Sequence, residues 1–191
     1  MTHPAGLSRL KAVVIAVMLT GFPPALAEVL SFDFMPKGGK ALFVDVFGAA
    51  PDAATLDEMT APARGEADWS SFLAARGSGL SDKELRTLSA YLAVNMPAKR
   101  DVLDAAAKAG DIATALPVDG RELAWNGCQG CHSLFAGYLT QDRDLQGWQN
   151  MFNSPFHREL KMAPQERDEF SRYSTINMPM KFEDVPEDLR F

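Results

Sequence analysis

Two cysteines and a histidine stand close together in the second half of the sequence. Cys128, Cys131 and His132 form a Cys-x-x-Cys-His pattern, and the 191 residues contain no other cysteine. Two thiols three positions apart lie on one turn of a helix, where both can add to the vinyl groups of one haem. The histidine that follows can bind the iron as its fifth ligand. The motif predicts one covalently attached haem c, with these three residues as its binding site. A redox-active or structural cysteine pair is the alternative.

Residues 1–27 have the features of an export signal. Arg9 and Lys11 give a positive start, residues 12–21 form a short apolar run, and residues 25–27 match an A-x-A cleavage site. The run is short for a membrane span, so an uncleaved anchor is the alternative, and contact with a membrane is expected only in that case. Because haem is attached to such motifs outside the cytoplasm, the signal and the motif together predict a periplasmic protein.

The balance of charge narrows the choice of partner. The chain carries 25 acidic and 19 basic side chains, a formal net charge of −6, and it becomes more acidic once Arg9 and Lys11 leave with the signal. An acidic surface disfavours nucleic acid as a partner. It favours a redox partner protein with a basic docking patch, although acidity also serves to keep an exported protein soluble. Residues 28–191 suffice for one ordinary domain or two small ones.

A tripeptide occurs twice, 82 residues apart, which suggests an internal repeat. Asn95-Met96-Pro97 returns as Asn177-Met178-Pro179, and each copy ends a predicted helix. The first helix begins at Ser81, where Glu84 completes a capping box, and the second begins at Pro164. A third helix, residues 121–126, leads into the haem motif. Further identities at the same offset are Glu84 with Glu166, Ser89 with Ser171, and Tyr91 with Tyr173.

At these residues the second half resembles the class I cytochrome c family. The shared features are a helix that ends in the Cys-x-x-Cys-His motif, a tryptophan in the middle segment, Trp148, and a last helix with an aromatic residue, Tyr173. The resemblance covers roughly residues 116–180. It implies an all-α fold in which the first and last helices cross and enclose the haem.

The first half looks like the same fold with its haem site erased. At the offset of 82 the cysteines and the histidine fall on Val46, Ala49 and Ala50. We therefore expect tandem cytochrome c-like helical domains, only the C-terminal one binding haem. Residues 28–105 would form a degenerate haem-less domain, and residues 106–191 a haem-binding domain with a solvated C-terminal tail from residue 181. Residues 102–115 are expected to join the halves. A helical extension unrelated to cytochromes is the alternative for the first half.

The sequence offers several candidates for the sixth ligand of the iron. A ligand should be present in the haem-binding half alone, which argues against Met178, because Met96 matches it. The resemblance implies a distal ligand in the loop ahead of the last helix, where His157 lies sixteen residues before Tyr173. His157 is therefore predicted as the second iron ligand. The alternatives are Met180 and Met151, followed by Met162, Met178 or an open site.

Together these features predict a periplasmic monohaem c-type cytochrome that acts as an electron carrier or as an electron-transfer subunit of a redox enzyme complex. Such a protein performs no bond chemistry itself, and no catalytic residue is predicted. The alternative is a haem enzyme or a gas or ligand sensor, which needs an open or labile sixth iron position.

Overall fold

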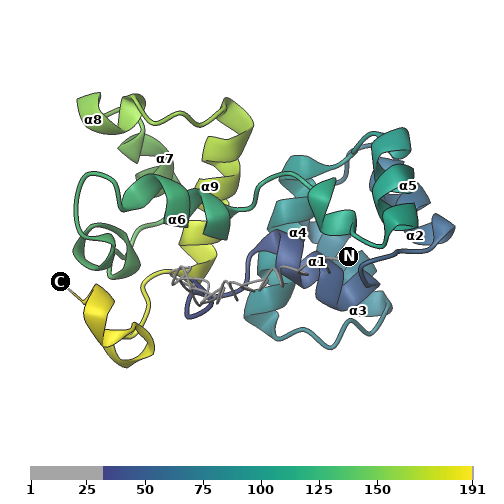
Figure 1. Cartoon of the computed structure of the whole chain (residues 1–191), viewed down its shortest axis with the longest axis horizontal. Helices are drawn as coiled ribbons and strands as arrows, with labels where there is room; N and C mark the ends of the chain where they lie inside the picture. Colours follow the sequence, from purple (N-terminus) through teal and green to yellow (C-terminus); the bar gives the residue numbers. More distant parts are fainter. Residues whose placement is uncertain (1–31, 191) are drawn as a thin grey trace, which may run out of the picture. The chain divides into compact units, whose positions relative to one another are not determined.

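The computed structural model describes residues 32–190 of the chain, so the predicted signal, residues 1–27, lies outside the described residues. Every element in this range is a helix or a helical turn, which confirms the all-α prediction (Figure 1). None of the helices described has the length and apolar character that a membrane span requires. The elements before residue 117 are α1 (Gly39–Phe47), α2 (Ala53–Thr60), α3 (Glu66–Ala75), α4 (Asp82–Asn95), α5 (Arg100–Ala109) and η1 (Ile112–Thr114). Those after it are α6 (Gly120–Cys128), the π-helical turn η2 (Phe135–Leu139), α7 (Leu145–Met151), α8 (Pro155–Arg158), α9 (Pro164–Asn177), η3 (Phe182–Asp184) and η4 (Glu187–Leu189).

The predicted helices begin and end where local side chains dictate. Ser81 caps α4, and the backbone N–H of Ser81 donates to Glu84 at 2.9 Å, which completes the capping box. Pro164 occupies the first turn of α9, where its missing N–H costs no hydrogen bond. Both helices stop at the asparagine of the repeated tripeptide, ahead of a cis Met–Pro bond. The third predicted helix lies within α6, and Asp119 caps its start.

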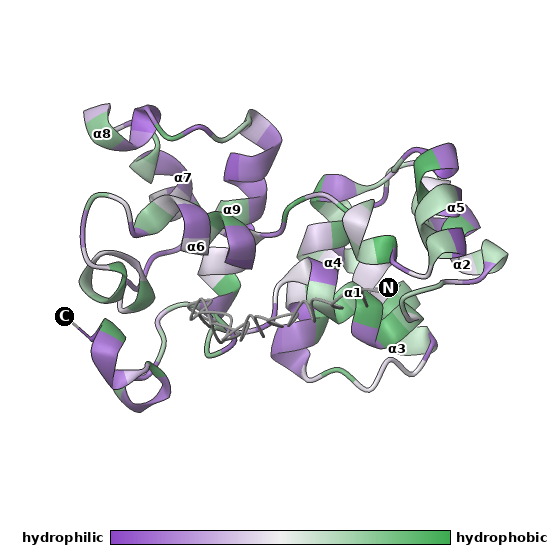
Figure 2. Ribbon diagram, viewed as in Figure 1, coloured by the Kyte–Doolittle hydropathy of each residue, from purple (hydrophilic) through white to green (hydrophobic). Residues whose placement is uncertain are grey.

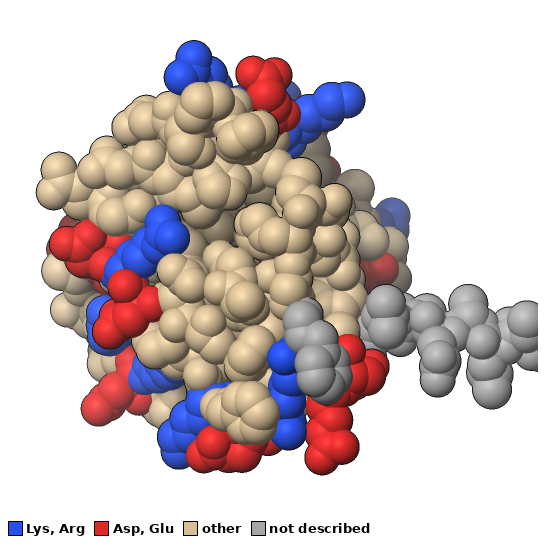
Figure 3. All heavy atoms as spheres, turned by 90° about the vertical axis from the view of Figure 1, so that its left-hand side faces the viewer, with Lys and Arg blue, Asp and Glu red and all other residues tan. Residues whose placement is uncertain are grey.

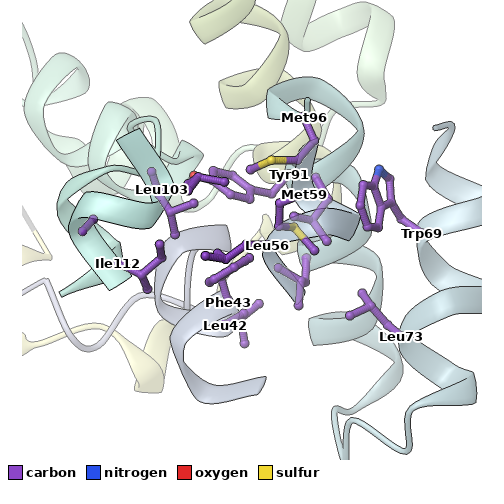
Figure 4. Close-up of a cluster of buried hydrophobic side chains, with 14 residues drawn as sticks. Leu42, Phe43, Leu56, Met59, Trp69, Leu73, Tyr91, Met96, Leu103 and Ile112 are labelled. Atoms are coloured by element: carbon purple, nitrogen blue, oxygen red, sulfur yellow. The ribbon is translucent and has the colours of Figure 1, made fainter. Parts of the chain in front are cut away.

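The buried apolar side chains form two separate clusters. Figure 4 shows the first, which is built around Trp69 and Tyr91, and the second contains Trp148, Tyr138 and Phe170. Figure 2 shows strongly hydrophobic residues on α1 and α3, whereas much of α9 is hydrophilic. Four polar residues of α9 are nevertheless buried, so this helix depends on hydrogen bonds as well as apolar contacts. They are Glu169, Ser171, Ser174 and Asn177.

Two segments pack differently from the sequence-based expectation. Residues 102–115 do not simply join the halves: α5 and η1 place Leu103 and Ile112 in the first cluster, which continues to Leu116. Leu103, Ile112 and Leu116 therefore pack with the side chains of α1 to α4. The expectation of a solvated tail from residue 181 is wrong for Val185, which is 1% exposed within the second cluster. The Arg190 guanidinium donates to the Val185 carbonyl at 2.8 Å and closes the turn around it.

Helices α4 and α9 contact each other through hydrogen bonds that come in matched pairs. The Asn95 amide on α4 donates to Glu169 on α9 at 3.4 Å. The Asn177 amide on α9 donates to Thr87 on α4 at 3.0 Å. Asn95 and Asn177 are 82 residues apart in the sequence, and so are Thr87 and Glu169. Each of the repeated asparagines therefore reaches across to the same position on the opposite helix.

The repeated tyrosines form a second matched pair of contacts across the halves. The Tyr91 hydroxyl donates to the Pro117 carbonyl at 2.8 Å, just ahead of α6. The Tyr173 hydroxyl donates to the Pro36 carbonyl at 2.6 Å, just ahead of α1. Each tyrosine thus holds the segment that leads into the first helix of the other half. The sequence repeat predicted the two equivalent tyrosines but not that their contacts cross.

A carboxylic acid lies buried where α9 faces α4 and the start of α6. Glu169 is 3% exposed, and its Oε1 accepts from the Gly120 N–H at 3.0 Å. Burial raises the pKa of Glu169 to about 8, because an ionised carboxylate loses its hydration there. The hydrogen bond from Gly120 opposes this rise, and the nearby Asp119 carboxyl adds to it.

The free energy of unfolding is expected to fall as the pH rises from 4.5, the ordinary pKa of Glu169, to its folded value of about 8. Within that window the folded state holds a proton that the unfolded state has released. The free energy of unfolding therefore falls by about 1.4 kcal/mol per pH unit. Glu169→Gln keeps an oxygen that accepts from Gly120 and should remove this loss. Urea unfolding at pH 5 and pH 8 measures it, with the exposed Glu187→Gln as the control. A wild-type pH dependence in Glu169→Gln would contradict the assignment.

Candidate cofactor site

A cavity of about 450 Å³ opens between the end of α6, η2 and α8. Cofactor pockets commonly measure about 300–1,000 Å³, so the space suits a cofactor of moderate size. The cavity brings together all four residues that the sequence predicts as haem-binding, although they come from two separate segments. Its lining consists of Gly127, Cys128, Cys131, His132, Gly137, Tyr138, Met151, Phe156, His157 and Leu160.

The two cysteines reach the cavity from the end of α6. Cys128 is the last residue of this helix and is partly buried, whereas Cys131 follows it and is exposed. Burial raises the pKa of the Cys128 thiol to about 12. A redox-active Cys-x-x-Cys pair requires a lowered thiol pKa, so this environment disfavours that alternative. Covalent attachment through both thiols remains compatible with the arrangement.

The ring of His132 is oriented by a backbone carbonyl. Its Nδ1 lies 3.2 Å from the Ser133 carbonyl oxygen. A carbonyl only accepts hydrogen bonds, so this contact places the proton on Nδ1. The lone pair of Nε2 is then available to a metal, which is the usual arrangement of a metal-binding histidine.

The ring of His157 is held by the cap of its own short helix. Ser154 caps α8 by accepting from the His157 backbone N–H at 3.4 Å, and Pro155 fills the first helical position. The Ser154 hydroxyl also lies 2.9 Å from Nδ1 of the His157 ring. Because Nδ1 is engaged, Nε2 is again the nitrogen left for a metal.

The two histidine rings face the same space. Their centroids lie 6.3 Å apart and their planes are inclined by 83°. A metal sits about 2 Å from an imidazole nitrogen, so two imidazoles that share one metal ion must lie within a few ångströms of each other. The observed separation therefore fits a single metal ion held between His132 and His157.

The methionines that the sequence left as alternative ligands lie in different places. Met151 lines the cavity beside His157. Met180 lines a second cavity instead, and Met178 is 7% exposed within the apolar cluster. Met162 lies close to Gly127 but does not line the cavity. Among the alternative methionines, Met151 is thus the one with direct access to the cavity.

Gly137 is a site residue that the sequence reasoning missed. A β-carbon added at this position would overlap Cε1 and Nδ1 of the His132 ring. Gly137 lies in the π-helical turn η2, a distortion often found at functional sites. A glycine between Ala136 and Tyr138, inside an otherwise helical stretch, was the available signal, because such a glycine commonly marks a close approach.

The described lining of the cavity contains no Lys, Arg, Asp or Glu side chain. Figure 3 looks at the side of the second half on which α8 and the C-terminal turns lie, and charged side chains gather near the edge of this face. Phe156, which lines the cavity next to His157, is 86% exposed.

Comparison with known proteins gives this site no counterpart. No protein-family model, no curated protein and no solved structure matches the chain.

Proposed function

We propose that this chain is a periplasmic monohaem c-type cytochrome that serves as an electron carrier or as an electron-transfer subunit of a redox enzyme complex. The observation that carries the proposal is the placement of the Cys-x-x-Cys-His motif and His157 around one cavity, with the two imidazoles at a separation suited to one iron. The proposal rests on the types and positions of these residues.

Each residue of the motif would have a defined part in holding the haem. Cys128 and Cys131 would form thioether bonds to one haem, and His132 and His157 would supply its axial nitrogens. The haem supplies one-electron chemistry at its iron. The chain sets the potential through the two imidazoles and through burial, and a second imidazole favours a lower potential than a methionine does.

We extend the proposal to the first half, as a cytochrome-like domain without haem. The matched contacts of α4 and α9 support it, and so does a pair of cation–π contacts 79 residues apart: Arg64 over Trp69 at 4.9 Å and Arg143 over Trp148 at 5.2 Å. The end of α1, where the haem motif would lie, instead contacts the turn η1. There the Ile112 N–H of η1 donates to the Ala49 carbonyl at 3.0 Å.

The proposed partner is a redox protein that docks on the face containing the cavity. The low charge of this face and the exposed Phe156 favour close apolar contact near the haem. A basic patch on the partner would then meet acidic side chains at the edge, in keeping with the net charge of the chain. Electron transfer across such a surface would be faster, because close contact shortens the distance between the two cofactors.

Mass spectrometry and electron paramagnetic resonance of the exported, mature protein test the proposal. We expect the mass of one covalently bound haem and a low-spin ferric signal, because two imidazoles give a strong axial field. A second haem would contradict the haem-less first half. High-spin iron that binds CO on reduction would instead support the enzyme or sensor alternative.

A further inference from the structure

A second cavity, of about 570 Å³, lies away from the histidines, where residues 34–37, the start of α4 and the segment after α9 meet. Three lysines line it, Lys37, Lys83 and Lys181, against one acidic residue, Asp184. In an acidic chain, such a concentration of positive charge is unexpected for a surface that only needs to stay soluble. The remaining lining is Phe34, Met35, Pro36, Asn177, Pro179 and Met180.

The first half contains an equivalent cavity of about 320 Å³, which provides an internal comparison. Asn95, Pro97 and Lys99 line it, at the positions that match Asn177, Pro179 and Lys181. The charges differ: Gln165 takes the place of Lys83, and Val102 takes the place of Asp184. The same arrangement of backbone thus carries three lysines in one copy and a single lysine in the other.

The lysines of the second cavity are incompletely neutralised. Lys37 forms an ion pair with Asp45 at 2.7 Å. In the described part of the chain, neither Lys83 nor Lys181 has a carboxylate within 4 Å, the limit for an ion pair. The Lys83 ammonium donates to the Asn177 carbonyl at 3.3 Å, which anchors it beside the cavity. Partial burial lowers the pKa of Lys83 and the nearby Asp184 opposes this change, so an anion in the cavity would add to the stabilisation of the ammonium.

We propose that this cavity binds a phosphate or sulfate group, held by Lys83 and Lys181. Ammonium groups bind such oxyanions through charge-assisted hydrogen bonds, which are stronger than bonds between neutral groups. The apolar part of the lining leaves room for a small organic portion beside the oxyanion. The site is independent of the haem, because its residues do not line the cavity of His132 and His157.

Isothermal titration of the full, haem-loaded protein tests this site. Sodium sulfate and sodium phosphate are titrated at an ionic strength held constant with sodium chloride. We expect saturable binding at one site, weakened at least about tenfold by Lys83→Gln, because hydrogen bonds to charged groups are the strong ones. Lys83→Gln introduces the residue found at the matched position, Gln165, so it suits the local backbone.

Lys99→Gln is the matched control, because it removes the lysine equivalent to Lys181 from the other cavity. It should leave binding unchanged, whereas Lys181→Gln should weaken it. Binding that does not saturate, or equal affinities of Lys83→Gln and the wild type, would overturn the proposal. Phenyl phosphate distinguishes the sources: tighter binding than inorganic phosphate indicates a phosphate ester, and equal binding indicates the free ion.

Discussion

Replacing His157 by alanine is expected to convert nearly all of the ferric iron from low spin to high spin. The centroid of the His157 ring lies 6.3 Å from that of His132, and Nδ1 of His157 is engaged by Ser154. Under the proposed ligation, alanine would remove the second iron-binding nitrogen while the thioethers would keep the haem in place. The reduced variant should also bind CO, which the wild type should not. Electron paramagnetic resonance and the CO difference spectrum measure the two effects.

The structure offers graded and matched controls for this variant. Ser154→Ala removes the hydroxyl that engages Nδ1 of His157 at 2.9 Å, so we expect a mixed-spin protein. Met151→Leu keeps an apolar residue of similar size in the cavity lining and should stay low-spin. An unchanged low-spin spectrum in His157→Ala would show that His157 is not the ligand. Loss of low spin in Met151→Leu alone would assign the sixth position to Met151.

Gly137→Ala is expected to displace the His132 ring and weaken the fifth ligand. The added methyl group overlaps the ring at Cε1 and Nδ1, and His132 is exposed enough to turn away rather than unfold the domain. We expect normal helix content by circular dichroism, but a lower thermal midpoint and a heterogeneous iron signal.

Gly130→Ala is the natural control for this substitution. Gly130 lies within the haem motif itself, yet a β-carbon added there meets no atom within 4 Å. Its haem content and iron spectrum should match those of the wild type. If Gly137→Ala behaved like Gly130→Ala, the close approach of the His132 ring would have no role in ligation.

The parts of the fold that the sequence predicted are those set by local chemistry. The start of α4 follows from Ser81 and Glu84, and that of α9 from Pro164, because capping involves residues within one turn. The packing of Leu103 and Val185 was not predictable in this way. Their segments bury single apolar residues against distant helices, and periodicity does not identify which helices those are.

The same distinction between local and long-range contacts applies to the candidate site. The spacing of Cys128, Cys131 and His132 carries its chemistry within five residues. His157 was predicted from a resemblance, and its opposition to His132 is the geometric support it now has, while its role as a ligand stays a prediction. Gly137 escaped notice because a glycine inside a helical stretch does not show which side chain approaches it, here the ring of His132 five residues earlier.

The matched contacts between α4 and α9 have a consequence for which amino-acid substitutions the chain can accept. Asn95 reaches Glu169 as Asn177 reaches Thr87, which is the self-complementary pattern of a symmetric homodimer, here within one polypeptide. In a true homodimer each substitution appears on both sides of the axis. Within one chain the two sides vary separately, so a threonine and a buried carboxylic acid can occupy equivalent positions. In the proposed tandem arrangement, covalent linkage would free one half to specialise while the other continued to supply its partner surface.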